Sequence, residues 1–195
     1  MIPDSLSEDD RQLLLRLARQ ALERGVRRES VDKLDLQALP ERLREAGASF
    51  VTLTRRGVLR GCIGALDAYQ PLVEDVCEHA VAAALQDYRF PPVTPDELAE
   101  IEIEISRLTT PKVLVYDDPK DLPKRLHPLI DGVVLKDGFR RATFLPQVWE
   151  KLPDPEVFLS HLCQKMGAPP DLWKRKVLEV FIYQVEEFHE SISGH

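Results

Sequence analysis

The stretch AEIEIEISRL, residues 99–108, alternates isoleucine with polar residues. Successive side chains of a strand point to opposite faces, so Ile101, Ile103 and Ile105 are expected to share one buried face. The glutamates and the serine then share a wet face. A strand with one buried and one wet face is typical of an antiparallel sheet. This alternation constrains the fold more than any other part of the chain.

Two predicted hairpins also favour an antiparallel sheet. Residues 48–54 and 58–64 read as strands joined by the turn RRG, and residues 132–145 read as a second hairpin that turns at Lys136-Asp137-Gly138. Helices are expected over 7–24, where Gly25 would end the helix, over about 71–88 and over 155–166, and further strands over 112–116 and 177–188.

Strands that come in hairpins, without strict alternation with helices, predict an α+β fold with a largely antiparallel, strongly curved sheet and helices packed on it. The length of 195 residues suits one domain. The order of elements in the first half is loosely echoed in the second half. The echo predicts two lobes, roughly residues 1–115 and 116–195.

Composition excludes several function classes. A net charge of −7 opposes a nucleic-acid-binding surface, and no apolar run reaches the roughly 20 residues that a membrane helix needs. Cys62, Cys77 and Cys163 are sparse and lack CxxC spacing, which predicts a reducing, cytoplasmic setting and no metal site. Neither a GxxxxGK nor a GxGxxG motif occurs, so no nucleotide cofactor is expected.

The segment RGCIG, residues 60–64, holds the candidate site. Glycines inside a strand mark a bulge, a bend, or the close approach of a backbone or a ligand, and here Gly61 and Gly64 flank Cys62. Arg60 lies two positions before Cys62, so in a regular strand the two side chains share a face. A nearby guanidinium favours the thiolate and would make Cys62 a candidate nucleophile. The alternative is an inert core cysteine, which is the more common role of free cysteine.

Other side chains offer chemistry with less specific signals. In DYRF, residues 87–90, Asp87 and Arg89 either pair with each other at the surface or project into a cleft as ligand-binding groups. The histidines show no paired spacing; His127 and His161 are the ones considered as partners of Cys62.

The quoted segments resemble a known family. LRGCIG, preceded by FVTLTRRG and followed by a helix that ends in DYRF, is similar to the signature of the AmmeMemoRadiSam system protein A family, also called the AMMECR domain. The likeness continues through IEIEIS, TFLPQVWE and VFIYQVEEF and covers nearly the whole chain. Tyr88 stands where the family often has proline, and Met166 departs from a common KAG; neither touches Cys62.

The resemblance implies a single AMMECR-like domain over residues 1–195, with two lobes and a groove near LRGCIG. It implies no established activity. It also implies association with a Memo-like protein and a radical-SAM protein, which would be the partners of the chain.

Three functions follow as expectations, and the third is an accessory or substrate-delivery subunit for the radical-SAM and Memo-like proteins. In the first, the groove binds a small anionic ligand, a peptide or a partner, with Arg60, Gly61, Gly64, Asp87 and Arg89 in contact with it. In the second, Cys62 is the nucleophile of an enzyme that transfers acyl or related groups. The sequence leaves open whether the chain is an enzyme at all, although the absence of an identifiable base at fixed spacing favours binding.

Overall fold

The computed structural model describes residues 5–30 and 34–190. The chain forms two compact units: unit 1 comprises Met1–Thr109 and Glu186–His195, and unit 2 comprises Thr110–Val185. The lobes expected from the sequence divided the chain near residue 115 and left the C-terminal strand in the second lobe. In the structure, the chain returns to unit 1 at its C-terminal end.

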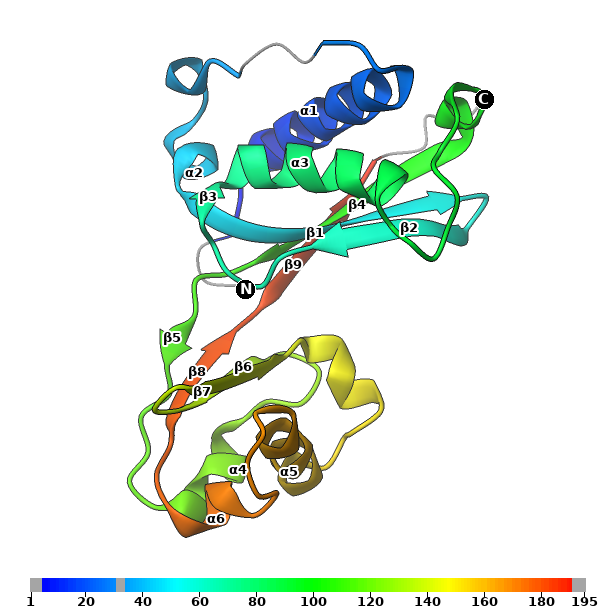
Figure 1. Ribbon diagram of the computed structural model, residues 1–195. Helices are drawn as coiled ribbons and strands as arrows, with labels where there is room; N and C mark the ends of the chain where they lie inside the picture. The colour runs from blue at the N-terminus through cyan, green and yellow to red at the C-terminus, as the bar shows by residue number, and fades with distance from the viewer. Residues whose placement is uncertain (1–4, 31–33, 191–195) are drawn as a thin grey trace. The chain divides into compact units, whose positions relative to one another are not determined.

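Unit 1 is a layer of helices on an antiparallel sheet. The long strand order is β2-β1-β4-β9, with the short β3 paired to the other end of β1. Figure 1 shows α1 and α3 side by side on one face of this sheet. The elements are α1 (Glu8–Arg27), η1 (Leu36–Ala38), α2 (Glu41–Arg44), β1 (Ala46–Arg55), β2 (Val58–Gly64), β3 (Gln70–Pro71), α3 (Leu72–Leu85), η2 (Pro95–Glu100), β4 (Ile101–Leu108) and β9 (Val185–His189).

The predicted alternation in β4 fixes which face of the sheet is buried. Ile103 and Ile105 are fully buried in the same core as Val51 and Leu53 of β1 and the apolar side of α1 and α3. The opposite face of β4 carries the glutamates. The helix-covered face and the polar face were therefore both readable from period-two spacing.

Unit 2 has its own sheet and core. The strand order is β5-β8-β6-β7, and all the pairs are antiparallel. Trp149 stacks on Phe158 at 3.6 Å between ring centroids in the centre of the core. The elements are β5 (Lys112–Val113), η3 (Pro119–Asp121), α4 (Leu122–Arg125), β6 (Gly132–Asp137), β7 (Arg140–Phe144), η4 (Pro146–Glu150), α5 (Pro155–Lys165), α6 (Leu172–Arg175) and β8 (Glu179–Tyr183).

The structure confirms the α+β class and corrects two local predictions. The strands form two sheets, because the predicted strand over 177–188 is interrupted at Gln184 and its halves, β8 and β9, join different sheets. Helix α1 continues through Gly25 and ends at Arg27, and the residue that caps it, Arg28, adopts a left-handed φ of 57°. The glycine at this helical position has a packing reason, because a Cβ there would meet Val81 of α3 at 2.9 Å.

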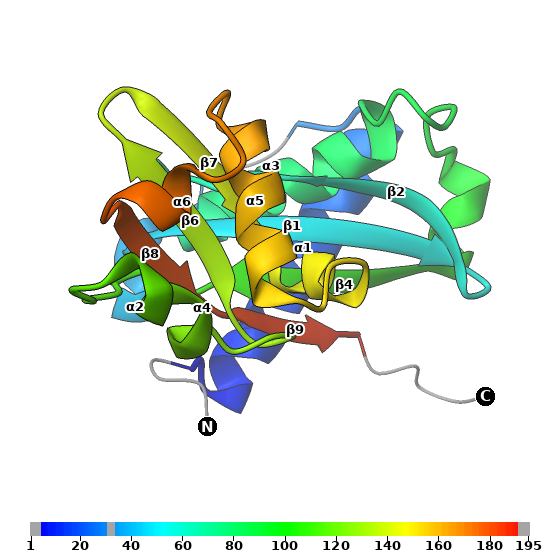
Figure 2. The ribbon, with the colours of Figure 1, turned by 90° about the horizontal axis from the view of Figure 1, so that it is seen from below.

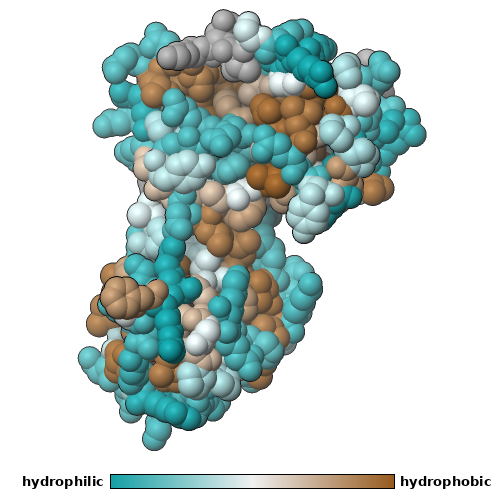
Figure 3. Space-filling view, viewed as in Figure 1, coloured by the Kyte–Doolittle hydropathy of each residue, from teal (hydrophilic) through white to brown (hydrophobic). Residues whose placement is uncertain are grey.

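The surface of both units is mostly hydrophilic on the side shown in Figure 3, with separated apolar patches. In the described ranges, no helix has the length and apolar character needed to cross a membrane.

Candidate functional site: the LRGCIG strand

The LRGCIG segment forms most of β2, which is the outer strand of the sheet in unit 1. Strands β1 and β2 meet in a tight turn at Arg56 and Gly57, which both have positive φ. The register pairs Cys62 with Thr52 and Gly61 with Leu53, then jumps to Leu59 with Thr54. Arg60 is thus the extra residue of a β-bulge, which breaks the two-residue period of the strand.

Gly61 is required by the packing of a helix on this strand. A Cβ at Gly61 would lie 2.1 Å from the carbonyl oxygen of Ala83 in α3, far inside any real contact. The close approach that the sequence predicted at this glycine is therefore made by the backbone of α3. The glycine lets the helix rest directly on the strand.

Gly64 has a similar packing role on the opposite face. A Cβ there would lie 2.4 Å from the ring of Phe50 and 2.5 Å from the carbonyl oxygen of Ser49. Since Phe50 is the cross-strand partner of Gly64, its ring lies over the bare glycine. Both glycines beside Cys62 thus have a packing reason within unit 1.

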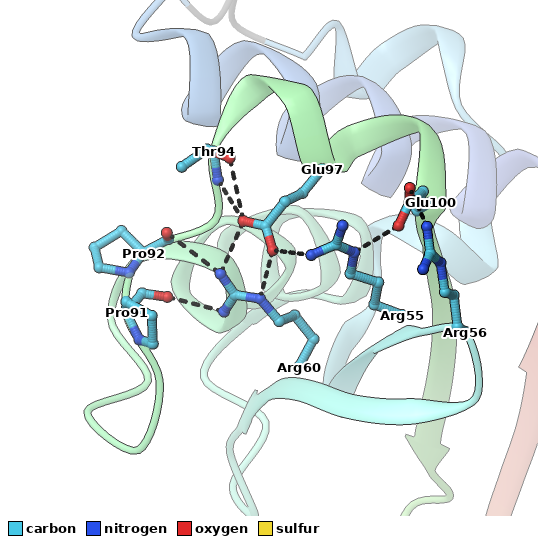
Figure 4. A network of polar contacts seen from close by, with 8 residues as sticks. All are labelled: Arg55, Arg56, Arg60, Pro91, Pro92, Thr94, Glu97 and Glu100. Carbon is cyan, nitrogen blue, oxygen red and sulfur yellow. Dashed lines mark hydrogen bonds and ion pairs between the residues drawn. The ribbon is translucent and has the colours of Figure 1, made fainter.

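Arg60 is bound to a carboxylate of η2. Its Nε and Nη2 donate to the two oxygens of Glu97 at 3.0 and 2.9 Å, and its remaining donors reach the carbonyls of Pro91 and Pro92. Figure 4 shows this guanidinium surrounded by its four acceptors. The side chain of Arg60 is 13% exposed.

Arg60 and Cys62 do not share a face. Arg55, which also binds Glu97 at 3.2 Å, lies in register with the helix-covered side of β1. Cys62 lies with Thr52 on the opposite, polar side. The expectation that Arg60 acts on the thiol is wrong, because the bulge turns its side chain towards Glu97.

The ion pairs around Arg60 continue along the hairpin. Arg55 also binds Glu100 at 2.6 Å, and Glu100 accepts a second bond from Arg56 at 2.9 Å. Figure 4 shows the alternating chain of arginines and glutamates between the hairpin and η2. Hydrogen bonds from Arg60 lower the pKa of Glu97 from 4.5 to about 2, helped by the N–H and hydroxyl groups of Thr94. Each of the three arginines is bound to one or both of the two glutamates, which leaves the network with one net positive charge.

Asp87 and Arg89 together bind the peptide groups of Cys62. The Asp87 carboxylate accepts the Cys62 N–H at 2.9 Å, and Arg89 donates to the Cys62 carbonyl at 3.4 Å. Arg89 also binds Asp87 through Nε and Nη2 at 2.9 and 2.6 Å. The pair takes the place of a neighbouring strand at the edge of the sheet, and edges left unpaired are prone to association.

Electrostatics strengthens this clamp. Hydrogen bonds from Arg89, then from the backbone N–H groups of Cys62 and Arg89, hold the pKa of Asp87 well below its usual value. The Asp87 side chain is 3% exposed, whereas that of Arg89 is 44% exposed. The sequence raised both a surface ion pair and a cleft-facing pair for these residues. The structure shows an ion pair that fixes the Cys62 backbone and leaves one side of Arg89 accessible.

The Cys62 side chain lies in a polar row on the face away from the helices. The Thr52 hydroxyl donates to Sγ at 3.4 Å, and Glu104 of β4 is the cross-strand neighbour of Thr52. Thiol, hydroxyl and carboxylate therefore follow one another across three adjacent strands. Cys62 is half-buried.

The other candidate groups lie elsewhere. His127 and His161 both belong to unit 2, where Nδ1 of His127 contacts Asp131 at 3.0 Å and Nδ1 of His161 contacts the Val157 carbonyl at 2.9 Å. Burial raises the pKa of the Cys77 thiol to about 12. Within residues 5–30 and 34–190, no group of three or more metal-ligating side chains is arranged to hold an ion.

Fold and site together define a class: an α+β protein of two antiparallel units whose distinctive feature is a clamped cysteine on an edge strand. The family model for AMMECR1 matches residues 15–188. The chain belongs to the AMMECR1 family.

Archaeal relatives align over nearly the full length. A protein of Methanothermobacter thermautotrophicus is 39% identical, with 95% of this chain and 96% of the relative covered. A protein of Thermococcus kodakarensis is 40% identical, with 92% and 89% covered. The crystal structure of an uncharacterised protein from Pyrococcus horikoshii matches with a TM-score of 0.74 and 33% identity, covering 95% of this chain and 93% of that chain. None of these names states an activity.

Sequence reasoning missed three residues that shape the site. Glu97 is the partner of Arg60, Thr52 contacts the thiol, and Glu104 completes the polar row. The last two were accessible in principle, because the predicted hairpin and the alternation in β4 place them on the wet face. Glu97 carried no such signal, since its contact depends on the bulge.

Proposed function

We propose that the chain is a binding protein whose site is the accessible side of Arg89 together with the polar row of Cys62, Thr52 and Glu104. Its ligand is a small molecule or peptide segment with an anionic end, which Arg89 would receive by a charge-assisted hydrogen bond. In this proposal, the chain serves a pathway of Memo-like and radical-SAM proteins as an accessory subunit.

The internal pairing of charge supports binding over nucleophilic catalysis. A cysteine nucleophile needs a cation or a base beside the thiol. Here Arg60 is bound to Glu97. Arg89 interacts electrostatically with Cys62, but its guanidinium is bound to the Asp87 carboxylate and to the backbone carbonyl of Cys62. The Asp87–Arg89 clamp instead immobilises the peptide around Cys62, which is what a preorganised binding surface requires.

The test uses the purified chain with the Memo-like and radical-SAM proteins of the same organism. We expect size-exclusion chromatography to show a complex that survives Cys62→Ser and is weakened by Arg89→Gln. Arg16→Gln removes an exposed arginine of α1 and is the matched control, which should leave the complex intact. A complex lost in Cys62→Ser and kept in Arg89→Gln would contradict the proposal, as would the absence of a complex.

One observation favours the alternative, an enzyme that uses Cys62 as an acyl acceptor. The Thr52 hydroxyl donates to Sγ, and a donor stabilises a thiolate. In such an enzyme, the thiolate attacks an ester carbonyl, a sulfur–carbon bond forms, the carbon–oxygen bond breaks and the alcoholate leaves.

p-Nitrophenyl acetate tests this alternative directly. A burst of p-nitrophenolate equal to the protein concentration, lost in Cys62→Ser and kept in the Cys77→Ser/Cys163→Ser protein, would establish the nucleophile. The binding proposal predicts that the wild type and Cys62→Ser release p-nitrophenolate at the same slow rate.

A further inference from the structure

The hairpin of β6 and β7 in unit 2 ends in an exposed aromatic residue surrounded by cations. Its two-residue turn consists of Gly138, with a φ of 59°, and Phe139. Phe139 is fully exposed. Figure 2 shows this turn as the free end of the hairpin. The fold of the hairpin requires the glycine and does not require an aromatic residue after it.

Positive charge gathers next to this ring. Lys136 lies opposite Arg141 in the strand register, and Arg140 lies opposite Asp137. Asp137 is bound by Lys176 at 2.5 Å. Glu179 lies opposite Lys136 in β8. Four cations against two carboxylates leave the end of the hairpin positive.

This arrangement costs stability within the unit. Like charges directly opposite each other in a hairpin are destabilising, and Lys136 faces Arg141 in this way. The stacking of Lys136 on Phe181, at 4.6 Å from the ring centroid, offsets part of that cost. A local arrangement that the fold does not favour is expected where it serves an external partner.

The net charges of the two units also differ: unit 2, which contains the hairpin, is positive, and unit 1 is negative. Residues 110–185 contain twelve lysines and arginines against ten aspartates and glutamates, a net charge of +2. The rest of the chain contains fourteen against twenty-three, a net charge of −9, which together give the total of −7. The hairpin end therefore stands out as a basic surface on an otherwise acidic protein.

We propose that the end of the β6–β7 hairpin is a docking surface for an acidic protein partner, with Phe139 as the apolar anchor and Arg140 as the main charged contact. Aromatic residues and arginine are the side chains most enriched at the energetic centres of protein interfaces. Charge complementarity selects an acidic partner segment, and the exposed ring requires apolar side chains among its acidic ones. This surface belongs to unit 2, whereas Cys62 belongs to unit 1, and the proposal does not depend on the function proposed for the Cys62 site.

Tyr88 in unit 1 provides a matched control. It is also an exposed aromatic residue, at 96%, but its neighbours Asp87 and Arg89 neutralise each other. If exposure of an aromatic ring alone were sufficient for docking, Tyr88 and Phe139 would be equivalent. If the surrounding positive charge is also needed, only Phe139 contributes to binding.

The experiment measures binding of a fluorescein-labelled peptide of repeated Glu-Glu-Leu to the full chain by fluorescence anisotropy. Phe139→Ala should weaken binding about fivefold or more, as expected for removal of an anchor residue. Arg140→Glu should weaken it about tenfold, and added salt should weaken wild-type binding. Tyr88→Ala and Arg16→Gln should leave it unchanged. Circular dichroism would show that all four variants are folded.

Other results would overturn the proposal. Peptide binding that stays intact in Phe139→Ala and in Arg140→Glu would contradict the proposal. An equal loss of peptide binding in Tyr88→Ala would also contradict it. Tighter binding to phosphatidylserine vesicles or to single-stranded RNA than to the peptide would assign the surface to another class of partner. Absence of peptide binding at low salt would also reject it.

Discussion

The two hairpins β1–β2, in unit 1, and β6–β7, in unit 2, differ in how the cations near their turns are paired. Both have two-residue turns, and both carry several cations near the turn. In β1–β2, each of Arg55, Arg56 and Arg60 is bound to Glu97 or Glu100. In β6–β7, Lys136 faces Arg141, and Phe139 extends beyond them.

This difference in charge pairing indicates whether the cations of a hairpin are bound within the same unit or can bind another molecule. The charges of β1–β2 are satisfied by η2 of the same unit, so this hairpin is fixed and serves to place Cys62. At the end of β6–β7, four cations stand against two carboxylates, so this hairpin is suited to bind another molecule.

Gly61→Ala should be the most damaging single change. The added Cβ would lie 2.1 Å from the Ala83 carbonyl oxygen, so strand and helix must separate. We expect a loss of about 3 kcal/mol in the free energy of unfolding, at the upper end for overpacking. Urea denaturation measures it.

Gly138→Ala in the other hairpin is the matched control for Gly61→Ala. Open space surrounds a Cβ there, and the cost of about 1 kcal/mol arises from the positive φ alone. Equal losses in the two variants would show that α3 does not press on β2 as described.

Glu97→Gln should cost about 2 kcal/mol, because the pair of charge-assisted bonds with Arg60 is weakened. It should also change the pH dependence. The folded pKa of Glu97 is about 2 against 4.5 in the unfolded chain, so its contribution is complete above pH 4.5 and is lost as the pH falls towards 2.

Denaturation midpoints between pH 7 and pH 2.5 test the role of Glu97. The Gln variant should lose less stability across this range than the wild type does. Asp87 also has a lowered pKa, so part of the acid sensitivity remains in Glu97→Gln. Identical pH profiles for the two proteins would contradict the assigned role of Glu97.

Asp87→Asn should loosen the clamp on Cys62 at a cost of about 1 kcal/mol, since an amide oxygen still accepts the Cys62 N–H but no longer pairs with the Arg89 charge. Hydrogen exchange of the Cys62 amide is the sensitive measurement. We expect faster exchange at Cys62, with unchanged exchange in β6. Unchanged exchange at Cys62 would show that Asp87 does not hold this peptide.

Cys62→Ser should have the smallest effect, below about 1 kcal/mol, because the replacement is nearly isosteric at a half-buried position and keeps a polar contact with Thr52. Thermal denaturation measures the change. A loss of several kcal/mol would show that the thiol is a core residue, contrary to its place in the polar row.

Local patterns explain most of what the sequence could predict. The alternation in β4 and the two hairpin turns are properties of neighbouring residues, and the structure confirms the strands they predicted. The division of the strands into two sheets was not predictable in this way. It depends on Gln184, where an otherwise continuous apolar strand changes its partners.

The sequence allowed most residues of the site to be predicted, but it did not allow their contacts to be predicted. The segments LRGCIG and DYRF were both singled out, and the structure joins them through Asp87, Arg89 and the Cys62 peptide. The role of Arg60 was misread, because a bulge cannot be recognised from regular strand geometry. Its partner Glu97 is 37 residues away in sequence. Long-range ion pairs of this kind leave no periodic trace.

The most direct test of the central claim is the rate of iodoacetamide alkylation of Cys62 at pH 7 in the Cys77→Ser/Cys163→Ser protein, with and without Arg60→Gln. The charge of Arg60 is bound to Glu97 on the other face of the sheet, so the two rates should agree within about twofold once both proteins are shown to be folded. A drop of about tenfold or more in the Arg60→Gln protein would show that this arginine activates the thiol, and Cys62 would then be a nucleophile.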